Sequence, residues 1–156
     1  MKVAKTAGIL SIIAGIVMIV AGAVTWGMVT SQLKAENIVV PDDSSIAAGQ
    51  PVAGPITAYA QAQIINEHAM KATDGLTYAE LGAKVKEAEE AGDTAAAEEF
   101  QGQRNTVMNA SFLRASLFTS VVSYGVAALV IGLGVFSLII GWALMSLPKP
   151  VARVEA

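Results

Sequence analysis

Few side chains of this sequence could do chemistry, and none of them forms a catalytic or metal-binding set. His68 is the only histidine, and the chain has no cysteine. A non-haem iron site usually needs two histidines and a carboxylate, and a structural zinc site needs several Cys or His ligands. Serine, threonine and aspartate are present, but no spacing pairs a nucleophile with a base. We therefore predict no catalytic, cofactor-binding or metal-ligating residues, and we expect His68 to be a solvated surface residue.

Two further sequence patterns argue against a calcium site and against a nucleic-acid partner. The acidic run at residues 87–99 lacks the alternating Asp/Asn ligands and glycine of a calcium loop, so it is typical of a solvated helix face. The segment between the two apolar stretches of the chain has too few basic residues to follow a phosphate backbone. We therefore expect no enzyme, no small-molecule substrate and no nucleic-acid partner.

Two long stretches without any charged residue indicate what kind of protein this is. They cover residues 6–33 and 115–148 and are rich in Ile, Val, Leu, Ala and Gly. A bilayer core is roughly 30 Å thick, so an apolar helix of about 20 residues crosses it. The sequence predicts an all-α membrane protein, in which two transmembrane helices form a hairpin and are joined by an exported, mostly helical loop.

The expected divisions follow from breakers and caps. The exported segment is irregular at 38–55 and helical at 57–72, 77–91 and 94–114, with a capping-box pattern at Thr77 and Glu80 and a further cap at Asp93. No strong breaker separates the last of these helices from the second span, so one helix could run through both. The complete set is a cytoplasmic tail at 1–6, transmembrane helix 1 at 7–29, the exported segment at 30–114, transmembrane helix 2 with an outward extension at 115–147, and a cytoplasmic tail at 148–156. Pro148 and Pro150 are expected to end the second helix.

Charge asymmetry predicts the orientation. The two tails carry four basic residues and one acid, a net charge of +3, whereas the segment between the spans carries six basic and twelve acidic residues, a net charge of −6. Basic flanks stay on the cytoplasmic side. We expect a multi-pass protein of the cell membrane with both termini cytoplasmic. A signal peptide cleaved near residues 21–23 is the alternative, but the apolar run continues to Val29, beyond the usual length of such a segment.

Small residues and aromatic residues mark candidate contact positions in both spans. Small residues let membrane helices approach closely, either to pack on each other or to bind another membrane protein. The candidate helix-packing residues are Gly8, Ser11, Gly15, Gly22, Gly125, Ala128 and Gly132, and the second series continues to Gly134 and Gly141. The candidate interfacial anchors are Trp26, Arg114, Tyr124 and Trp142. Arg114 could reach lipid headgroups or pair with an acid of a partner.

Four stretches of the sequence carry a resemblance to a known family. They are TWGMVTSQLKAENI at residues 25–38, TAYAQA at 57–62, TYAEL at 77–81 and NASFLRASLF at 109–118. The chain resembles a family of small actinobacterial two-span membrane proteins that includes the prokaryotic respiratory supercomplex association factor. Members of this family often carry a label as aromatic ring-opening dioxygenases, which a lone histidine does not support.

The resemblance implies a role by packing rather than by chemistry. It implies a non-enzymatic accessory subunit of a respiratory supercomplex of the cytochrome bcc–aa3 oxidase type. Larger membrane subunits would be its partners, together with the lipid bilayer, and haem and copper would belong to those subunits. The rival hypothesis is a stand-alone membrane protein whose exported loop binds or senses a ligand.

Overall fold

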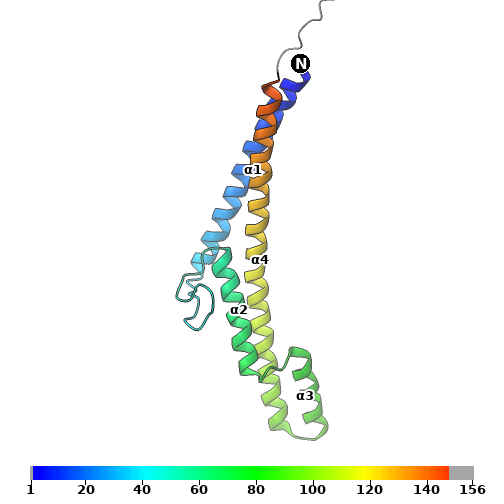
Figure 1. Cartoon of the computed structure of the whole chain (residues 1–156). Helices are drawn as coiled ribbons and strands as arrows, with labels where there is room; N and C mark the ends of the chain where they lie inside the picture. The colour runs from blue at the N-terminus through cyan, green and yellow to red at the C-terminus, as the bar shows by residue number, and fades with distance from the viewer. Residues whose placement is uncertain (1, 148–156) are drawn as a thin grey trace, which may run out of the picture. The chain divides into compact units, whose positions relative to one another are not determined.

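The computed structural model describes residues 2–147. Within that range the chain forms four helices, which are α1 (Lys2–Ala35), α2 (Pro55–Ala72), α3 (Tyr78–Glu90) and α4 (Thr94–Met145) (Figure 1). The described residues contain no strand, only an isolated antiparallel bridge between Val39 and Pro51. The all-α prediction is therefore confirmed. The predicted stop at Pro148 and Pro150, and the tail that contains them, lie outside the described residues.

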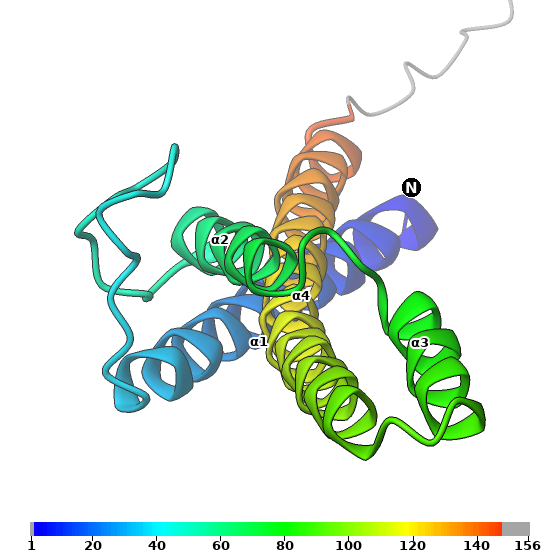
Figure 2. The ribbon, with the colours of Figure 1, turned by 90° about the horizontal axis from the view of Figure 1, so that it is seen from below.

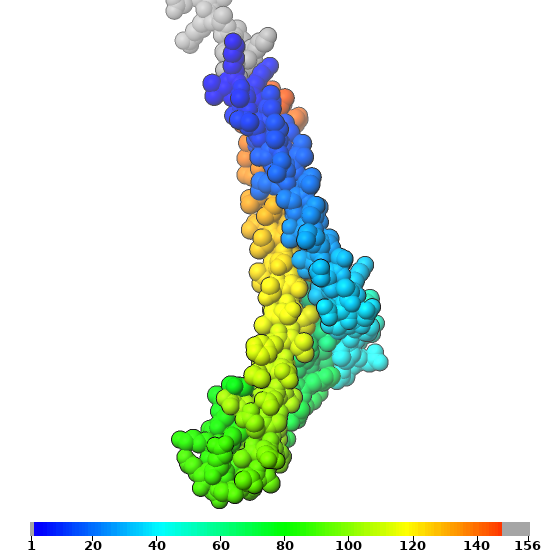
Figure 3. Space-filling model, turned by 180° about the vertical axis from the view of Figure 1, so that it is seen from behind, coloured from blue at the N-terminus to red at the C-terminus, as the bar shows by residue number. Residues whose placement is uncertain are grey.

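The helices belong to two compact units. Among the described residues, one unit, here the helix-pair unit, contains residues 2–29 and 123–147, and the other, the loop unit, contains Thr30–Val122. In the helix-pair unit, α1 and the C-terminal part of α4 lie directly side by side, as the blue and orange segments of Figure 3 show.

Both long helices have the properties of membrane spans. α1 and α4 are each long and apolar enough to cross a membrane, and only 17% of the most apolar window of each is buried within the chain. The core helix of a soluble domain would be mostly buried, whereas the apolar windows of these helices have their large side chains outside. Exposed examples are Leu10, Ile13, Val17, Val126, Leu129 and Phe136. The two helices therefore favour association with a membrane.

The loop unit has a small core of its own. α2 and α3 pack on the first part of α4, and after a tight turn at Gly92 (φ +74°) α4 runs back beside α3 (Figure 2). Val40, Val52, Ile64 and Leu81 are at most 1% exposed. Burying one such side chain contributes roughly 1.5–3 kcal/mol, which offsets part of the entropy lost in ordering the unit.

The capping residues expected at the starts of α3 and α4 form the predicted hydrogen bonds. In the expected capping box, the Glu80 N–H donates to Thr77 Oγ1 at 3.4 Å and the Thr77 N–H donates to Glu80 Oε2 at 2.8 Å. Asp93 Oδ1 accepts from the Ala96 N–H at 3.0 Å and so caps α4. α2 begins two residues earlier than expected, because Pro55 occupies its first position, where a missing N–H costs nothing.

The segment before α2 is irregular, as expected, but it is ordered by backbone hydrogen bonds. The Val40 N–H donates to the Gln50 carbonyl and the Val52 N–H donates to the Ile38 carbonyl, each at 2.9 Å. These bonds bring Val40 and Val52 together at the ends of a closed loop, where both are buried.

The expected helices at 94–114 and 115–147 form one element. α4 has 52 residues and ends at Met145. No proline interrupts α4. Gly102 is the one glycine of α4 before the uncharged stretch, and it is tolerated within the helix.

Candidate functional site

Three glycines of α1 form the closest contact between the two long helices. A Cβ atom built at Gly8 would lie 2.8 Å from the Gly141 carbonyl oxygen, and one at Gly15 would lie 2.6 Å from that of Gly134. At Gly22 it would lie 2.9 Å from the carbonyl oxygen of Ala127. Side-chain carbons do not approach backbone oxygens so closely, so the helices meet at these distances only because the side chains are absent.

The facing series on α4 has the same spacing of seven residues. It consists of Ala127, Gly134 and Gly141, all of which are buried. Ser11 adds a hydrogen bond, because its hydroxyl donates to the carbonyl of Ser137 at 2.7 Å. A seven-residue repeat keeps one seam facing the partner helix along a gentle left-handed crossing, which suits two antiparallel helices in lipid. The sequence prediction that Gly8, Ser11, Gly15 and Gly22 lie on a packing face therefore agrees with their positions.

The candidate positions on α4 divide between two faces: Gly134 and Gly141 meet α1, whereas Gly125, Ala128 and Gly132 lie away from it. Gly125, Ala128 and Gly132 are exposed, and a Cβ at either glycine would meet no atom within 4 Å. Two residues separate Gly125 from Ala127, and 200° of helical rotation places them on different faces. We call Gly125, Ala128 and Gly132 the open small-residue face.

The predicted aromatic anchors divide into buried and exposed residues. Tyr124 is only 1% exposed, and its ring meets that of Trp26 edge to face with centroids 4.7 Å apart. Its assignment as an interfacial anchor is therefore corrected, because Tyr124 packs within the helix pair and adds roughly 0.5–1.5 kcal/mol there beyond its buried area. Trp26 is 37% and Trp142 70% exposed. Their interfacial role remains a prediction.

Arg114 lies in the loop unit, where it lines a cavity. The cavity volume is about 230 Å³, and we call it the Arg114 cavity. Its lining comes from α2, α3 and α4 and from the N-cap of α3, and comprises Asn66, Ala69, Met70, Thr77, Tyr78, Val107, Ala110, Ser111 and Arg114. The guanidinium of Arg114 lies 5.9 Å from the centre of the Phe118 ring, and its Nε is buried without a hydrogen-bond partner. Arg114 is thus half-buried beside a cavity rather than fully extended into solvent.

Arg104 is a second half-buried arginine on the same helix. Its guanidinium carbon lies 4.2 Å from the centre of the Tyr78 ring, within cation–π distance. Its Nε is also buried without a hydrogen-bond partner. Arg104 does not line the Arg114 cavity, although Tyr78 is common to both environments.

The lone histidine is exposed, as predicted, but it has a partner that the sequence did not reveal. His68 Nε2 lies 2.7 Å from Asp43 Oδ2, and the two side chains are 48% and 54% exposed. The hydrogen bond from His68 lowers the pKa of Asp43 below its ordinary value. The pair joins the irregular segment to α2. Among residues 2–147, no group of three or more His, Asp or Glu side chains is placed to hold a metal ion.

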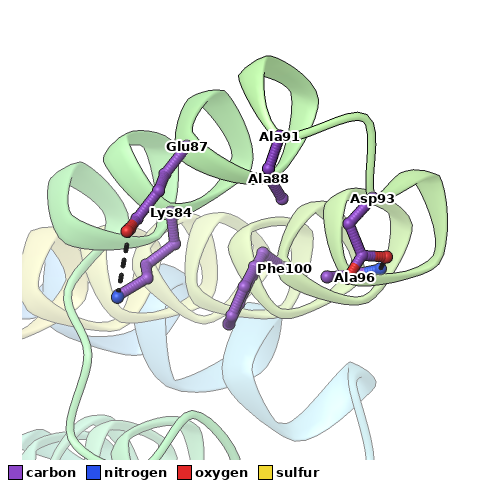
Figure 4. A pocket seen from close by; sticks show the side chains of 7 residues that line it. All are labelled: Lys84, Glu87, Ala88, Ala91, Asp93, Ala96 and Phe100. Carbon is purple, nitrogen blue, oxygen red and sulfur yellow. Dashed lines mark hydrogen bonds and ion pairs between the residues drawn. The ribbon is translucent and has the colours of Figure 1, made fainter.

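A second cavity lies between α3 and the start of α4, and its charged side chains already have partners within the chain. Its volume is about 250 Å³. Figure 4 shows that its charged lining is already used: Lys84 pairs with Glu87 at 3.2 Å, and Asp93 caps α4. The remaining lining is Ala88, Ala91, Ala96 and Phe100. It is therefore a weaker candidate than the Arg114 cavity.

Comparison of the chain with protein-family models, with curated proteins and with solved structures finds no match.

Proposed function

We propose that this chain is a non-enzymatic accessory subunit that associates with a respiratory supercomplex of the cytochrome bcc–aa3 oxidase type. α1 and α4 hold it in the cell membrane as a multi-pass protein, with both termini cytoplasmic and the loop unit exported. The resemblance of residues 25–38, 57–62, 77–81 and 109–118 to the family of supercomplex association factors supports this class of partner.

The observation that carries the proposal is the division of small residues between two faces of α4. One series, Ala127, Gly134 and Gly141, is occupied by α1. The open small-residue face has the same kind of residues, and among residues 2–147 no atom lies within 4 Å of a Cβ built at Gly125 or Gly132. Because lipid removes the hydrophobic incentive for helices to associate, a backbone surface that permits close approach is what a partner helix can use.

In this proposal the subunit acts by packing and carries no cofactor of its own. The haem and copper of the assembly belong to its larger membrane subunits. The open small-residue face receives a helix of one of them, and the loop unit contacts their exported parts. The binding energy is distributed over surfaces, so function depends on shape at Gly125, Ala128 and Gly132 rather than on a reactive group.

The test is affinity purification of the tagged chain from mild-detergent extracts, with haem absorbance as the readout. We expect haem to be recovered with the parent protein, and Gly132→Leu to reduce that recovery because its side chain fills the open face. Ile139→Leu is the control, since Ile139 is 57% exposed and leucine has the same size as isoleucine. All variants are compared at matched membrane abundance.

Two outcomes would contradict the proposal. Recovery of the parent chain as a small oligomer without haem would favour the rival hypothesis of a stand-alone binding or sensing protein. Equal haem recovery with Gly132→Leu and with the parent would remove the open small-residue face from the contact.

A further inference from the structure

The Arg114 cavity contains a cation that no described acidic residue neutralises. Among residues 2–147, no carboxylate forms an ion pair with Arg114. Its Nε is buried without a hydrogen-bond partner, and no acidic residue lines the cavity. One lining residue, Thr77, already binds an acid, because its hydroxyl and N–H donate to Glu80 Oε2 at 2.7 and 2.8 Å. A half-buried guanidinium without an acid favours an anionic ligand.

Two other donors of the lining are available to such a ligand. The Asn66 amide and the Tyr78 hydroxyl form no hydrogen bond with another described residue. The hydroxyls of Thr77 and Ser111 are already used, because they donate to Glu80 and to the Val107 carbonyl. An anion in this cavity would therefore meet an arginine fork, an amide N–H and a phenolic O–H, which together suit an oxyanion with several acceptor atoms.

The size and position of the cavity narrow the choice of anion. A volume of about 230 Å³ is below the roughly 300–1,000 Å³ of pockets that enclose drug-sized molecules, so it fits a headgroup rather than a whole metabolite. Arg114 is the last charged residue before the uncharged stretch of α4. It comes directly before the segment at 115–147 that is predicted to contain transmembrane helix 2 and its outward extension. Lipid headgroups occupy the layer just outside the hydrocarbon core.

We propose that the Arg114 cavity binds the phosphate group of an anionic phospholipid, with Arg114 as the cation and with Asn66 and Tyr78 as additional donors. The acyl chains of the lipid would lie along the apolar surface of α4 beyond Arg114. The proposal rests on the membrane placement of the chain but not on its respiratory partner. Lipid retention is measured on the isolated chain and the proposed function by haem recovery, so the failure of one is distinguishable from the failure of the other.

The experiment is native mass spectrometry of the full chain in detergent, titrated with phosphatidylglycerol, with phosphatidylcholine and with inorganic phosphate. We expect one phosphatidylglycerol per chain to be retained in preference to phosphatidylcholine. Arg114→Gln should weaken this binding about tenfold or more, because charge-assisted hydrogen bonds are lost. Arg104→Gln is the matched control: it removes the same charge from a half-buried arginine of the same helix, but not from the lining, and should bind as the parent does.

Tyr78→Phe supplies a second variant that does not remove a charge. It keeps the ring beneath Arg104 and deletes only the hydroxyl, so we expect a loss of a few fold. Circular dichroism of each variant reports whether the helices are retained. If Arg114→Gln fails to fold, an unchanged affinity in Tyr78→Phe still counts against the proposed donor set.

Four results would overturn the proposal. Parent-like phosphatidylglycerol binding by Arg114→Gln would exclude Arg114, and an equal loss in Arg104→Gln would indicate unspecific attraction. Binding of inorganic phosphate without phosphatidylglycerol would assign the cavity to free phosphate. No retained lipid, together with lower haem recovery for Arg114→Gln, would show that Arg114 pairs with an acid of a protein partner.

Discussion

Substituting Gly15 by alanine should separate the two long helices. A Cβ at this position would lie 2.6 Å from the Gly134 carbonyl oxygen and 3.0 Å from Cγ and Cδ2 of Leu138. Ordinary contact begins near 3.4 Å, so the shortfall against the backbone oxygen is 0.8 Å. A backbone oxygen cannot turn aside as a side chain can, so the helices themselves must move apart.

The magnitude follows from the size of this displacement. A gap of 0.5–1 Å forfeits about a quarter to a half of the dispersion energy of the atoms that lose contact. Overpacking of a tight contact costs about 1–3 kcal/mol, which corresponds to a shift of roughly five- to 150-fold in the equilibrium between packed and separated helices. Gly132→Ala is the matched control, because a Cβ at Gly132 meets nothing within 4 Å.

The contact between Trp26 and Tyr124 supplies the assay. In a Trp142→Phe background, Trp26 is the remaining tryptophan, and its ring lies 4.7 Å from that of Tyr124. Titration of mixed micelles with SDS, followed by Trp26 fluorescence, reports the separation of the helix pair. We expect Gly15→Ala to separate at lower SDS than the parent and Gly132→Ala to follow the parent. Coincident curves for the two variants would refute the packing argument.

Three further predictions concern the loop unit and the orientation. Thr77→Ala should destabilise α3 by about 0.5–2 kcal/mol, which faster hydrogen exchange in α3 alone would reveal, whereas unchanged exchange would mean that the cap contributes nothing. The pKa of Asp43 is lowered in the folded chain, so its contribution to stability is complete above its ordinary value of 3.8 and is lost as the pH falls through the lower folded value. The fall in the Tm of the loop unit from pH 6 to pH 3 should therefore be smaller in Asp43→Asn, and an equal fall would contradict the pairing. Single cysteines at Ser45 and Ala152 test the orientation on whole cells with a membrane-impermeant reagent. We expect labelling at Ser45 only, and the reverse pattern would overturn the topology.

Features governed by neighbouring residues were predictable from the sequence. The capping box of Thr77 and Glu80 depends on side chains three residues apart, and its geometry is present in the structure. The seven-residue spacing of Gly8, Gly15 and Gly22 likewise defines one face of one helix, whatever lies opposite.

Features that depend on pairing distant elements were not predictable in the same way. α4 carries two small-residue series, one through Gly125 and Gly132 and one through Gly134 and Gly141, and both have a spacing of seven. Because the two series lie on different faces, the rotation of α4 about its own axis decides which series meets α1, and hydropathy does not specify that rotation. Tyr124 was misassigned for the same reason, since its place along the helix was visible but the face on which it lies was not.

The Arg114 cavity forms only where the helices of the loop unit pack together, so the sequence alone did not reveal it. Its donors come from Asn66, Tyr78 and Arg114, which belong to three different helices. The sequence did single out Arg114 as a cation among apolar residues. Nothing in the spacing of the other two residues indicated that they would line one cavity with it.

The most direct test of the central claim is native gel electrophoresis of membranes from cells that lack this chain, compared with cells that retain it. We expect the oxidase supercomplex band to diminish in its absence and to separate into its component complexes, each still active, because the chain contributes packing and no cofactor. Expression of the parent chain should restore the band. An unchanged supercomplex band in membranes without the chain would contradict the proposed role as an accessory subunit.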